Sequence, residues 1–410
     1  MHTEDYIQLE DAYNAHSYDP VDVVIARAEG VWVWDVEGKK YLDCLSAYSA
    51  LNQGHRHPRI VKALIEQAGK VTLTSRAFRN DQLPLFAEEL CELTGHDMIL
   101  PMNSGAEAVE TAIKAARRWG NFVKGIEEPE IIVCQNNFHG RTISIISFST
   151  EADYRKGFGP FTPGFRIVPF GDAEALEAAI TPSTAAFLVE PIQGEAGVIV
   201  PPEGYLRDAR DICDEHNVLL ITDEIQTGLG RTGKLFAYEW EGIKPDLVVI
   251  GKALSGGMMP ASAVLGSREV MELFTPGSHG STFGGNPLAC AVAREAVKVL
   301  VEEDLIGRAR ELGAYLRERL RDLNSPLIKE IRGKGLLVGV EFTKEAGDAR
   351  RFVNAMKDRG VLVKDTHRKI IRFAPPLVIT KEQIDLLLAR FEDVLTTALE
   401  ESPSEILSAA

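Results

Sequence analysis

The sequence predicts an α/β protein with a mostly parallel central sheet and helices on both faces, followed by a smaller α+β domain. Two short apolar runs, 218–222 and 247–250, are typical of strands covered on both faces, as in a parallel sheet. Between residues 98 and 252, strand patterns alternate with helical patterns, which favours βαβ units. After about residue 324 this alternation stops, and short strands mix with two helices.

The predicted elements follow one another in three segments. In the first, a β-hairpin and two helices are expected at Val31–Val36 with Lys40–Leu45, Ile60–Ala68 and Leu83–Leu93. In the second, we expect a helix ending at Trp119, strands at Ile131–Cys134, Arg166–Phe170 and Ala185–Val189, and helices at Ala173–Ile180, Tyr205–His216 and Leu288–Glu303. In the third, we expect strands at Leu336–Phe342, Val361–Val363 and Ile370–Phe373, with helices at Ala349–Arg359 and Lys381–Leu399.

These patterns suggest the domain organisation. A chain of 410 residues with 45% hydrophobic content can bury a large core, and ~150 residues per domain gives two or three domains. We expect a large α/β domain over residues 51–323 and a small α+β domain over residues 324–410. We expect the N-terminal segment, residues 1–50, to pack with the small domain.

Composition excludes several kinds of partner and location. The net charge is −15 without any block of five basic residues, which argues against nucleic acid or an anionic membrane surface. No apolar stretch approaches the ~20 residues of a membrane span. The five cysteines are scattered and form no CxxC motif, which is typical of a reducing compartment. The first residues show no secretory or transit signal, so we expect a cytoplasmic protein.

A charged residue ends each of the two apolar runs. Asp223 follows the first and Lys252 the second. Ligands of parallel sheets lie outside the carboxyl ends of the strands, so an acid and an amine would reach one cleft. This pair suits pyridoxal 5'-phosphate, because the amine can bind its aldehyde covalently and the acid can keep its ring nitrogen protonated. Taken singly, the lysine could be a solvated loop residue and the aspartate a turn former.

A possible phosphate site lies at the start of the predicted helix that ends at Trp119. Ser104 and Gly105 stand where a helix exposes unpaired N–H groups and the positive end of its dipole. An ordinary N-cap explains these two residues equally well.

Two further motifs carry no predicted site. His55 and His57 could bind a metal, but no carboxylate or cysteine cluster stands near them in the sequence. Gly228-Leu-Gly-Arg-Thr-Gly233 fits the dinucleotide pattern G-x-G-x-x-G. That fingerprint should follow its strand directly and open a helix, whereas residues 224–227 intervene here and the next residues start a helix poorly. We therefore expect neither a metal nor a nucleotide.

The residues Thr222–Gly228 and Gly251–Gly257 together resemble the class III, or ω-amino-acid, aminotransferases. The resemblance extends from about Tyr13 to about Leu399, and residues elsewhere narrow it to the ornithine δ-aminotransferase group. It implies the fold-type I arrangement of pyridoxal phosphate-dependent transferases, a pyridoxal 5'-phosphate cofactor, and a homodimer with shared active sites, with a higher oligomer left open.

The resemblance also implies roles for particular residues around the cofactor. Lys252 and Asp223 are the matched catalytic pair. Phe138 matches the aromatic residue that stacks on the cofactor ring, and Gln226 the residue that hydrogen-bonds its hydroxyl. His139, which follows Phe138, would also belong to the cofactor site, and many family members have Trp at its position. The phosphate would be held by Ser104, Gly105 and Ala106, and, from the partner subunit, by Ser281 and Thr282.

For the substrates, the resemblance implies transfer of the δ-amino group of L-ornithine to 2-oxoglutarate. Glu195 matches a glutamate that pairs with the arginine matching Arg372. Tyr18 and Arg141 would hold the ornithine carboxylate farther out. Tyr48 matches a position associated with preferring ornithine over γ-aminobutyrate.

Three alternatives stay open from the sequence. An acetylornithine or γ-aminobutyrate aminotransferase would share the family, although Tyr18 and Tyr48 argue against both. A pyridoxal phosphate-dependent racemase would share the fold but need no oxo-acid. A non-catalytic relative would not need Asp223, Lys252 and Phe138 intact.

Overall fold

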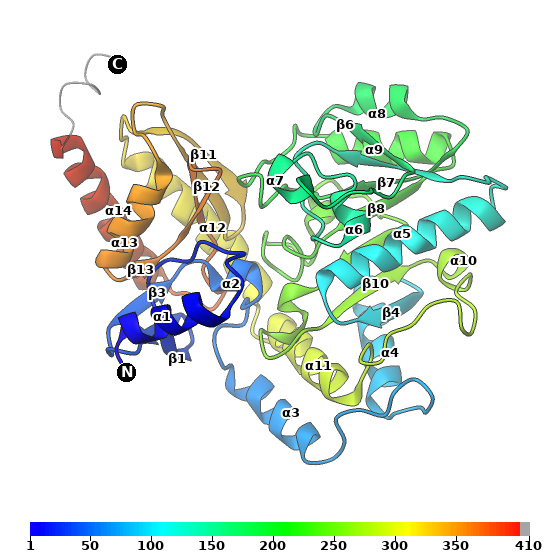
Figure 1. The fold of residues 1–410 in the computed structure, drawn as a ribbon, viewed down its shortest axis with the longest axis horizontal. Helices are drawn as coiled ribbons and strands as arrows, with labels where there is room; N and C mark the ends of the chain where they lie inside the picture. Colours follow the sequence, from blue (N-terminus) through cyan, green and yellow to red (C-terminus); the bar gives the residue numbers. More distant parts are fainter. Residues whose placement is uncertain (402–410) are drawn as a thin grey trace.

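The computed structural model describes residues 1–401, which form a larger body and a smaller body side by side (Figure 1). The larger body is built on a seven-stranded sheet with the strand order β4-β10-β9-β8-β7-β5-β6. Its strands are β4 (Met98–Met102), β5 (Glu130–Cys134), β6 (Phe165–Val168), β7 (Thr184–Val189), β8 (Leu219–Asp223), β9 (Leu247–Ile250) and β10 (Ser262–Gly266). Only β10 runs antiparallel to its neighbours β4 and β9, so the predicted mostly parallel sheet is confirmed.

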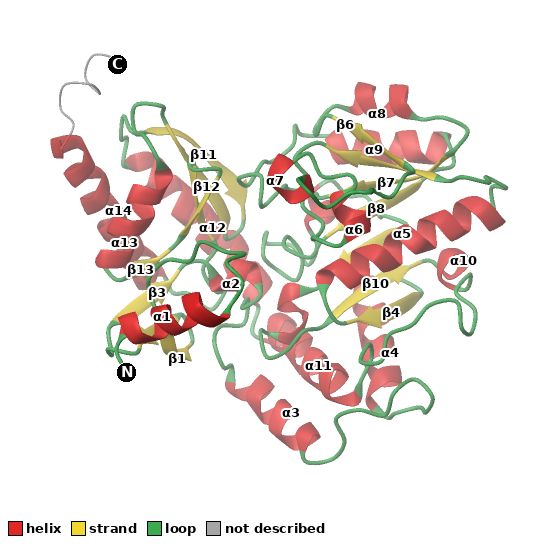
Figure 2. Ribbon diagram, in the orientation of Figure 1, coloured by secondary structure: helices red, strands yellow, loops and turns green. Residues whose placement is uncertain are grey.

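Helices cover both faces of this sheet, as Figure 2 shows. Ile131 and Val133 of β5 pack into the cluster that contains α5 (Gly105–Phe122), on one face. Ile132 and Cys134 pack on the other face with α8 (Ala173–Ala179) and α9 (Tyr205–Glu215). Because both sets of alternate side chains are buried, the strand reads as a continuous apolar run.

Three further helices pack at the β4–β10 side of the sheet. They are α3 (Pro58–Ala68), α4 (Gln82–Thr94) and α11 (Pro287–Glu302), and α11 contacts both of the others. The short helices of the larger body are α6 (Ile143–Ile146), α7 (Ala152–Arg155), α10 (Arg268–Met271), η1 (Ala237–Trp240) and η2 (Lys252–Ser255).

The smaller body contains two four-stranded sheets. An antiparallel sheet has the order β11-β12-β15-β14, and its elements are β11 (Ile328–Lys334), β12 (Leu337–Phe342), β14 (Lys364–Thr366) and β15 (Ile370–Phe373). The helices beside it are α12 (Leu305–Asp322), α13 (Ala349–Asp358) and α14 (Lys381–Glu401). The other sheet has the order β1-β2-β3-β13. Its strands are β1 (Ile25–Glu29), β2 (Trp32–Asp35), β3 (Lys40–Asp43) and β13 (Val361–Leu362). In the sequence, α1 (Thr3–Tyr13) precedes β1, and the turn α2 (Ser46–Ser49) follows β3.

The N-terminal segment is therefore tied to the C-terminal part of the chain. Strand β13 pairs in parallel with β3, with Val361 opposite Leu42. The division at residues 50 and 323 remains a proposal, since α12 contacts both α11 and β11. The last nine residues of the proposed small domain, 402–410, lie outside the described residues.

Several elements were not predicted, for identifiable reasons. The strands β1, β11 and β14 are edge strands, and neither β1 nor β11 contains a fully buried residue, so their sequences lack an apolar run. Helix α1 buries none of its residues, and α12 carries many charges and two glycines. The β-hairpin and the other predicted helices and strands are confirmed to within a few residues. Across residues 1–401, no helix is both long and apolar enough to cross a membrane.

The core of the smaller body depends on a cluster of phenylalanine rings. Phe391 of α14 is fully buried, and its ring centroid lies 5.3 Å from that of Phe373. We expect Phe391→Ala to lower the free energy of unfolding by about 3–5 kcal/mol, because it leaves a cavity. Thermal unfolding followed by circular dichroism measures the effect. The control Phe122→Ala removes a ring that is 63% exposed and should change stability little, and equal melting temperatures for the two variants would contradict the prediction.

Candidate active site

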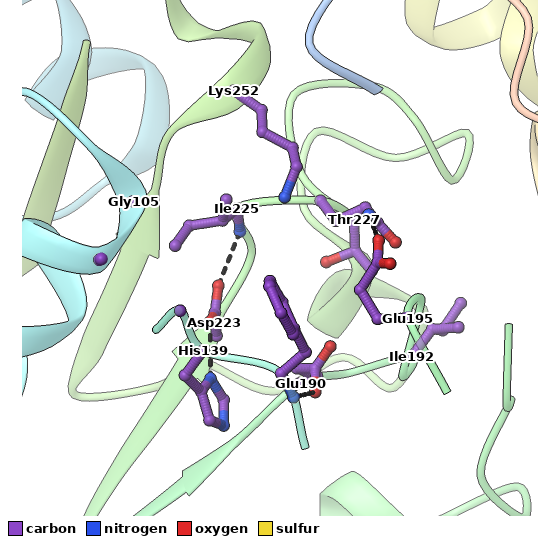
Figure 3. A pocket seen from close by; sticks show the side chains of 13 residues that line it. Gly105, His139, Glu190, Ile192, Glu195, Asp223, Ile225, Thr227 and Lys252 are labelled. Carbon is purple, nitrogen blue, oxygen red and sulfur yellow. Dashed lines mark hydrogen bonds and ion pairs between the residues drawn. The ribbon is translucent and has the colours of Figure 1, made fainter. Parts of the chain in front are cut away.

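One cavity lies at the carboxyl ends of the parallel strands. The loops that follow β5, β7, β8 and β9 leave the sheet at this edge, and the start of α5 adjoins them (Figures 1 and 3). The residues that line the cavity come from these segments: Gly105, Ala106, Phe138, His139, Gly140, Glu190, Ile192, Glu195, Asp223, Ile225, Gln226, Thr227 and Lys252. The predicted meeting of Asp223 and Lys252 at one site is thus observed.

Lys252 extends its amine into the cavity, on the side opposite Asp223 and His139 in Figure 3. Its backbone is left-handed, with φ of 38°, at the point where β9 gives way to η2. Enclosure by protein lowers the pKa of Lys252 below its ordinary value, although Glu195 and Asp223 favour the charged form. A lowered pKa makes the neutral, nucleophilic amine easier to reach.

Asp223 is held by two hydrogen bonds. Its Oδ1 accepts from the backbone N–H of Ile225 at 3.0 Å, and its Oδ2 lies 2.7 Å from Nδ1 of the buried His139. Burial opposes a charge on His139, but the hydrogen bond and charge of Asp223, with Glu190, raise its pKa above the ordinary value. His139 therefore orients the carboxylate from behind. Among residues 1–401, Nε2 of His139 has no hydrogen-bond partner.

The start of α5 offers free backbone amides to the same cavity. Ser104 is the N-cap, its Oγ accepts from Glu107 N at 3.2 Å, and its own N–H donates to Glu107 Oε2 at 2.7 Å. The next two amides, of Gly105 and Ala106, belong to the first turn and have no acceptor within the helix. A Cβ at residue 105 would lie 2.9 Å from Ile225 Cδ1, so glycine allows Ile225 to pack closely against the helix start. The arrangement is a suitable phosphate site.

The buried Arg372 and the partly exposed Glu195 form an ion pair at the side of the cavity. Arg372 Nη1 donates to Glu195 Oε1 at 2.7 Å, and Gln226 Nε2 donates to the same oxygen at 2.9 Å. Burial opposes ionisation of Glu195, but Arg372 and Lys252 outweigh it and lower its pKa to about 2. Within the described residues, Nε and Nη2 of Arg372 have no partner. Gln226, predicted to bond a cofactor hydroxyl, here takes part in the ion pair.

The other predicted substrate residues fall into two groups. Arg141 lies among aromatic rings, with its Cζ 5.7 Å from the centroid of Tyr18 and 4.5 Å from that of Tyr154. Tyr48 lies over Arg372, whose Cζ is 5.4 Å from the ring centroid. The structure thus brings together Tyr18 with Arg141, and Tyr48 with Arg372.

Ser281 and Thr282 do not line this cavity. Ser281 Oγ accepts from Asn103 Nδ2 at 2.8 Å, beside the start of α5, and Thr282 is exposed. Their predicted contact with a partner subunit lies beyond what a single chain contains.

Glu190 and Tyr154 are site residues that the sequence patterns did not single out. Glu190 is buried in the cavity wall, and its Oε1 accepts from Phe138 N at 2.9 Å. Burial raises the pKa of Glu190 to about 8. It directly follows β7, so the strand-end rule that identified Asp223 could have found it. No sequence signal pointed to Tyr154, which reaches Arg141 from α7.

The cavity and the sheet around it define a pyridoxal 5'-phosphate-dependent aminotransferase of fold type I. The sequence profile of the Aminotransferase class-III family matches residues 13–395, and the chain belongs to that family. Pyridoxal 5'-phosphate is its cofactor, and the observed groups fit it: an amine on Lys252, an oriented carboxylate on Asp223 and two free amides for the phosphate.

Similar proteins within this family are named for their substrates. The chain is 60% identical to the ornithine aminotransferase of Brevibacillus brevis over 95% of this chain and 97% of that one. Its fold matches the crystal structure of the ornithine aminotransferase of Toxoplasma gondii with a TM-score of 0.96 and 48% identity, covering 98% and 96% of the two chains. It also matches the acetylornithine aminotransferase of Elizabethkingia anophelis, with a TM-score of 0.88, 49% identity and coverage of 97% and 100%.

The raised pKa of Glu190 predicts a pH dependence of stability. Between about pH 4.5 and 8 the folded protein keeps the Glu190 proton that the unfolded chain releases, so stability falls as pH rises through this window. Glu190→Gln should remove this decline, a difference of up to about 4 kcal/mol between pH 5 and 8. Melting temperatures across the window measure it, with exposed Glu203→Gln as the control. If the melting temperatures of the wild type and of Glu190→Gln change in parallel with pH, the prediction is contradicted.

Proposed function

We propose that the enzyme transfers the δ-amino group of L-ornithine to 2-oxoglutarate. The products are glutamate and glutamate 5-semialdehyde, which cyclises to pyrroline-5-carboxylate. The observation that carries the proposal is the closed Glu195–Arg372 ion pair beside Lys252. The relatives named ornithine aminotransferase, at 60% and 48% identity over nearly the whole chain, support it.

The ion pair matters because the two substrates present different groups to the same reacting atom. Ornithine reacts at its δ-amine, so its carboxylate lies several carbons away. With Glu195 paired to Arg372, the charge of that arginine is already neutralised, so the ornithine carboxylate is bound farther out by Arg141 and Tyr18. A site that holds the α-carboxylate outside directs the δ-amine inward.

2-Oxoglutarate reverses this arrangement. It carries a carboxylate next to the reacting carbon and another at the far end. When Glu195 releases Arg372, the guanidinium binds the α-carboxylate, while Arg141 binds the γ-carboxylate. Arg372 already has Nε and Nη2 without partners in the described residues, which suits a bidentate contact.

Each residue around the cavity has a separate role in the proposed reaction. When bound, pyridoxal 5'-phosphate supplies the aldehyde carbon that carries the amino group and a ring that accepts the electron pair from the δ-carbon. Lys252 accepts the proton that leaves the δ-carbon, a role its lowered pKa favours. Asp223, oriented by His139, would pair with the protonated ring nitrogen. Phe138, Gly105 and Ala106 line the cavity. Phe138 would provide a stacking surface for the cofactor ring, and Gly105 and Ala106, with Ser104, would hold the phosphate.

The active unit in this proposal is a cytoplasmic homodimer. Ser281 and Thr282 would reach the phosphate bound by the partner subunit. Their neighbour Phe283 is 56% exposed in the single chain, and Tyr18 is 71% exposed, so a second subunit would cover apolar surface beside the site.

Acetylornithine is the second candidate donor. The E. anophelis acetylornithine aminotransferase is as similar in sequence to this chain as the T. gondii ornithine aminotransferase. The two donors differ at the α-nitrogen, which is acetylated in one and charged in the other.

A single half-reaction tests the donor. The purified pyridoxal 5'-phosphate form is mixed with L-ornithine without any oxo-acid, the visible absorbance of the cofactor is followed, and the carbon product is identified. We expect pyrroline-5-carboxylate. The α-oxo product would contradict δ-transfer, and reaction with acetylornithine alone would assign the second candidate donor.

A substitution tests the ion pair. Glu195→Ala leaves Arg372 permanently free for an α-carboxylate, so α-amino donors such as glutamate should improve relative to ornithine by about tenfold or more in kcat/KM. Steady-state rates with both donors measure the ratio. The control is Glu203→Ala, which removes an exposed carboxylate outside the cavity. An unchanged ratio in Glu195→Ala would rule out the switching role of the pair.

A further inference from the structure

The geometry points to Ser46 and Arg231 as positioning residues for donor selection: together they hold the turn that places Tyr48 against Arg372. Neither residue lines the cavity or touches a reacting atom. The inference rests on the proposed function, because it assigns the means by which Tyr48 is held where it can discriminate between ω-amino donors.

The turn that carries Tyr48 has an unusual backbone. Residues Ser46, Ala47, Tyr48 and Ser49 all have positive φ, at 47°, 49°, 59° and 71°. L-residues adopt this left-handed conformation singly and rarely in succession, because Cβ approaches the following carbonyl oxygen. Four in a row persist only where the surroundings determine the conformation. The contacts of this turn should therefore show what holds it.

Hydrogen bonds fix the turn at its first residue. Asp43 Oδ1 accepts from the backbone N–H groups of Leu45 at 2.9 Å and Ser46 at 2.8 Å. Ser46 Oγ donates to the carbonyl of Ala374 at 2.6 Å, and Ala374 N donates to Cys44 O at 2.7 Å. Ala374 stands two residues after Arg372. The same contacts thus tie the turn to the strand end that carries the substrate arginine.

Arg231 completes this attachment from the larger body. Its side chain is fully buried, and its Nη2 donates to Ser46 Oγ at 3.1 Å and to Asn52 Oδ1 at 2.6 Å. Its Nη1 donates to the carbonyls of Leu336 at 2.9 Å and Pro375 at 2.6 Å. No ion pair of Arg231 occurs within residues 1–401. Its planar donors therefore join three chain segments around the turn rather than neutralise a charge.

The G-x-G-x-x-G motif explains how Arg231 becomes buried. Gly230 and Gly233 have φ of 89° and 86°. A Cβ at residue 230 would lie 2.8 Å from Leu300 Cδ2, and one at residue 233 would lie 2.8 Å from Arg310 Cα. The glycines let the loop lie directly under α11 and α12. The motif that resembles a nucleotide fingerprint instead places an arginine behind the substrate site.

His55, considered above as a metal ligand, belongs to the same network. Its Nε2 lies 2.7 Å from Asp43 Oδ2, while His57 pairs separately with Glu303 at 3.3 Å. Asp43 is thus oriented by His55 on one oxygen and holds the turn with the other. The chain of contacts runs from His55 through Asp43 and the turn to Arg231.

The first test compares donors in two variants. Ser46→Ala removes the hydroxyl that donates to Ala374 and accepts from Arg231, and Arg231→Lys cannot reach all four acceptors. We expect the ratio of kcat/KM for ornithine to that for γ-aminobutyrate to fall about tenfold in Ser46→Ala and at least as far in Arg231→Lys. The matched control is Arg317→Lys, because Arg317 donates to Gly335 O at 2.8 Å, beside Leu336, without touching the turn. It should lose stability without changing the ratio.

A double-mutant cycle shows whether Ser46 acts through Tyr48. In a Tyr48→Ala background, adding Ser46→Ala should leave the donor ratio unchanged. A further tenfold fall in that background would overturn the inference. So would a crystal structure of Ser46→Ala in which residues 46–49 remain left-handed while the ratio falls. Equal losses with both donors, matched by a lower melting temperature, would reduce Ser46 to a purely structural role and also overturn it.

Failure of the proposed function would be visible separately. If the wild type does not use ornithine, the δ-transfer proposal fails, and the cycle is repeated with the ω-amino donor that the wild type does use. Energetic coupling between residues 46 and 48 in that donor's kcat/KM would still support the positioning role, and its absence would overturn it.

Discussion

The parallel pairing of β7, β8 and β9 is the constraint on which the active site depends. These strands are buried on both faces, so charged groups can stand only where the strands end. Glu190, Asp223 and Lys252 occupy those ends and meet in one cavity. The fold thus concentrates two acids and an amine around one cavity, at the carboxyl edge of the sheet.

Burial makes the charges in this cavity depend on one another. Each group would lose its ionised form in isolation, and the direction of each pKa shift depends on its partners. Glu195 stays ionised because Arg372 and Lys252 face it, whereas burial, with Asp223 and Glu195 nearby, raises the pKa of Glu190. In the proposed mechanism, an incoming carboxylate replaces Glu195 on Arg372, and 2-oxoglutarate carries such a group next to its reacting carbon. The proposed exchange uses the same charge attraction that holds the closed pair.

Two buried arginines serve this site in different ways. Arg372 keeps an ionic partner and two unused nitrogens, so it can exchange one carboxylate for another. Arg231 donates to four neutral oxygens from three chain segments and has nothing to exchange. A buried guanidinium can thus bind a substrate carboxylate or hold chain segments together by hydrogen bonds. The chemical nature of its acceptors decides which of the two it does. Both arginines lie next to the turn of Tyr48: Arg231 donates to Ser46 in that turn, and Arg372 lies beside the Tyr48 ring.

The fold class, the family and the meeting of Asp223 and Lys252 in one cleft could be predicted from the sequence, because apolar runs, strand ends and long motifs are local signals. The positions of Asp223 and Lys252 after two apolar runs were enough to place both in one cleft, and Gly105 at its helix start was equally visible. Edge strands such as β11 and the polar helix α12 were missed, because partial burial leaves no apolar pattern. Three contacts became visible only in the folded chain: His139 orients Asp223, Tyr154 lies beside Arg141, and Arg231 supports the turn of Tyr48. These contacts join residues 13 to 185 positions apart, and no local pattern encodes a distance that the packing of the whole chain sets.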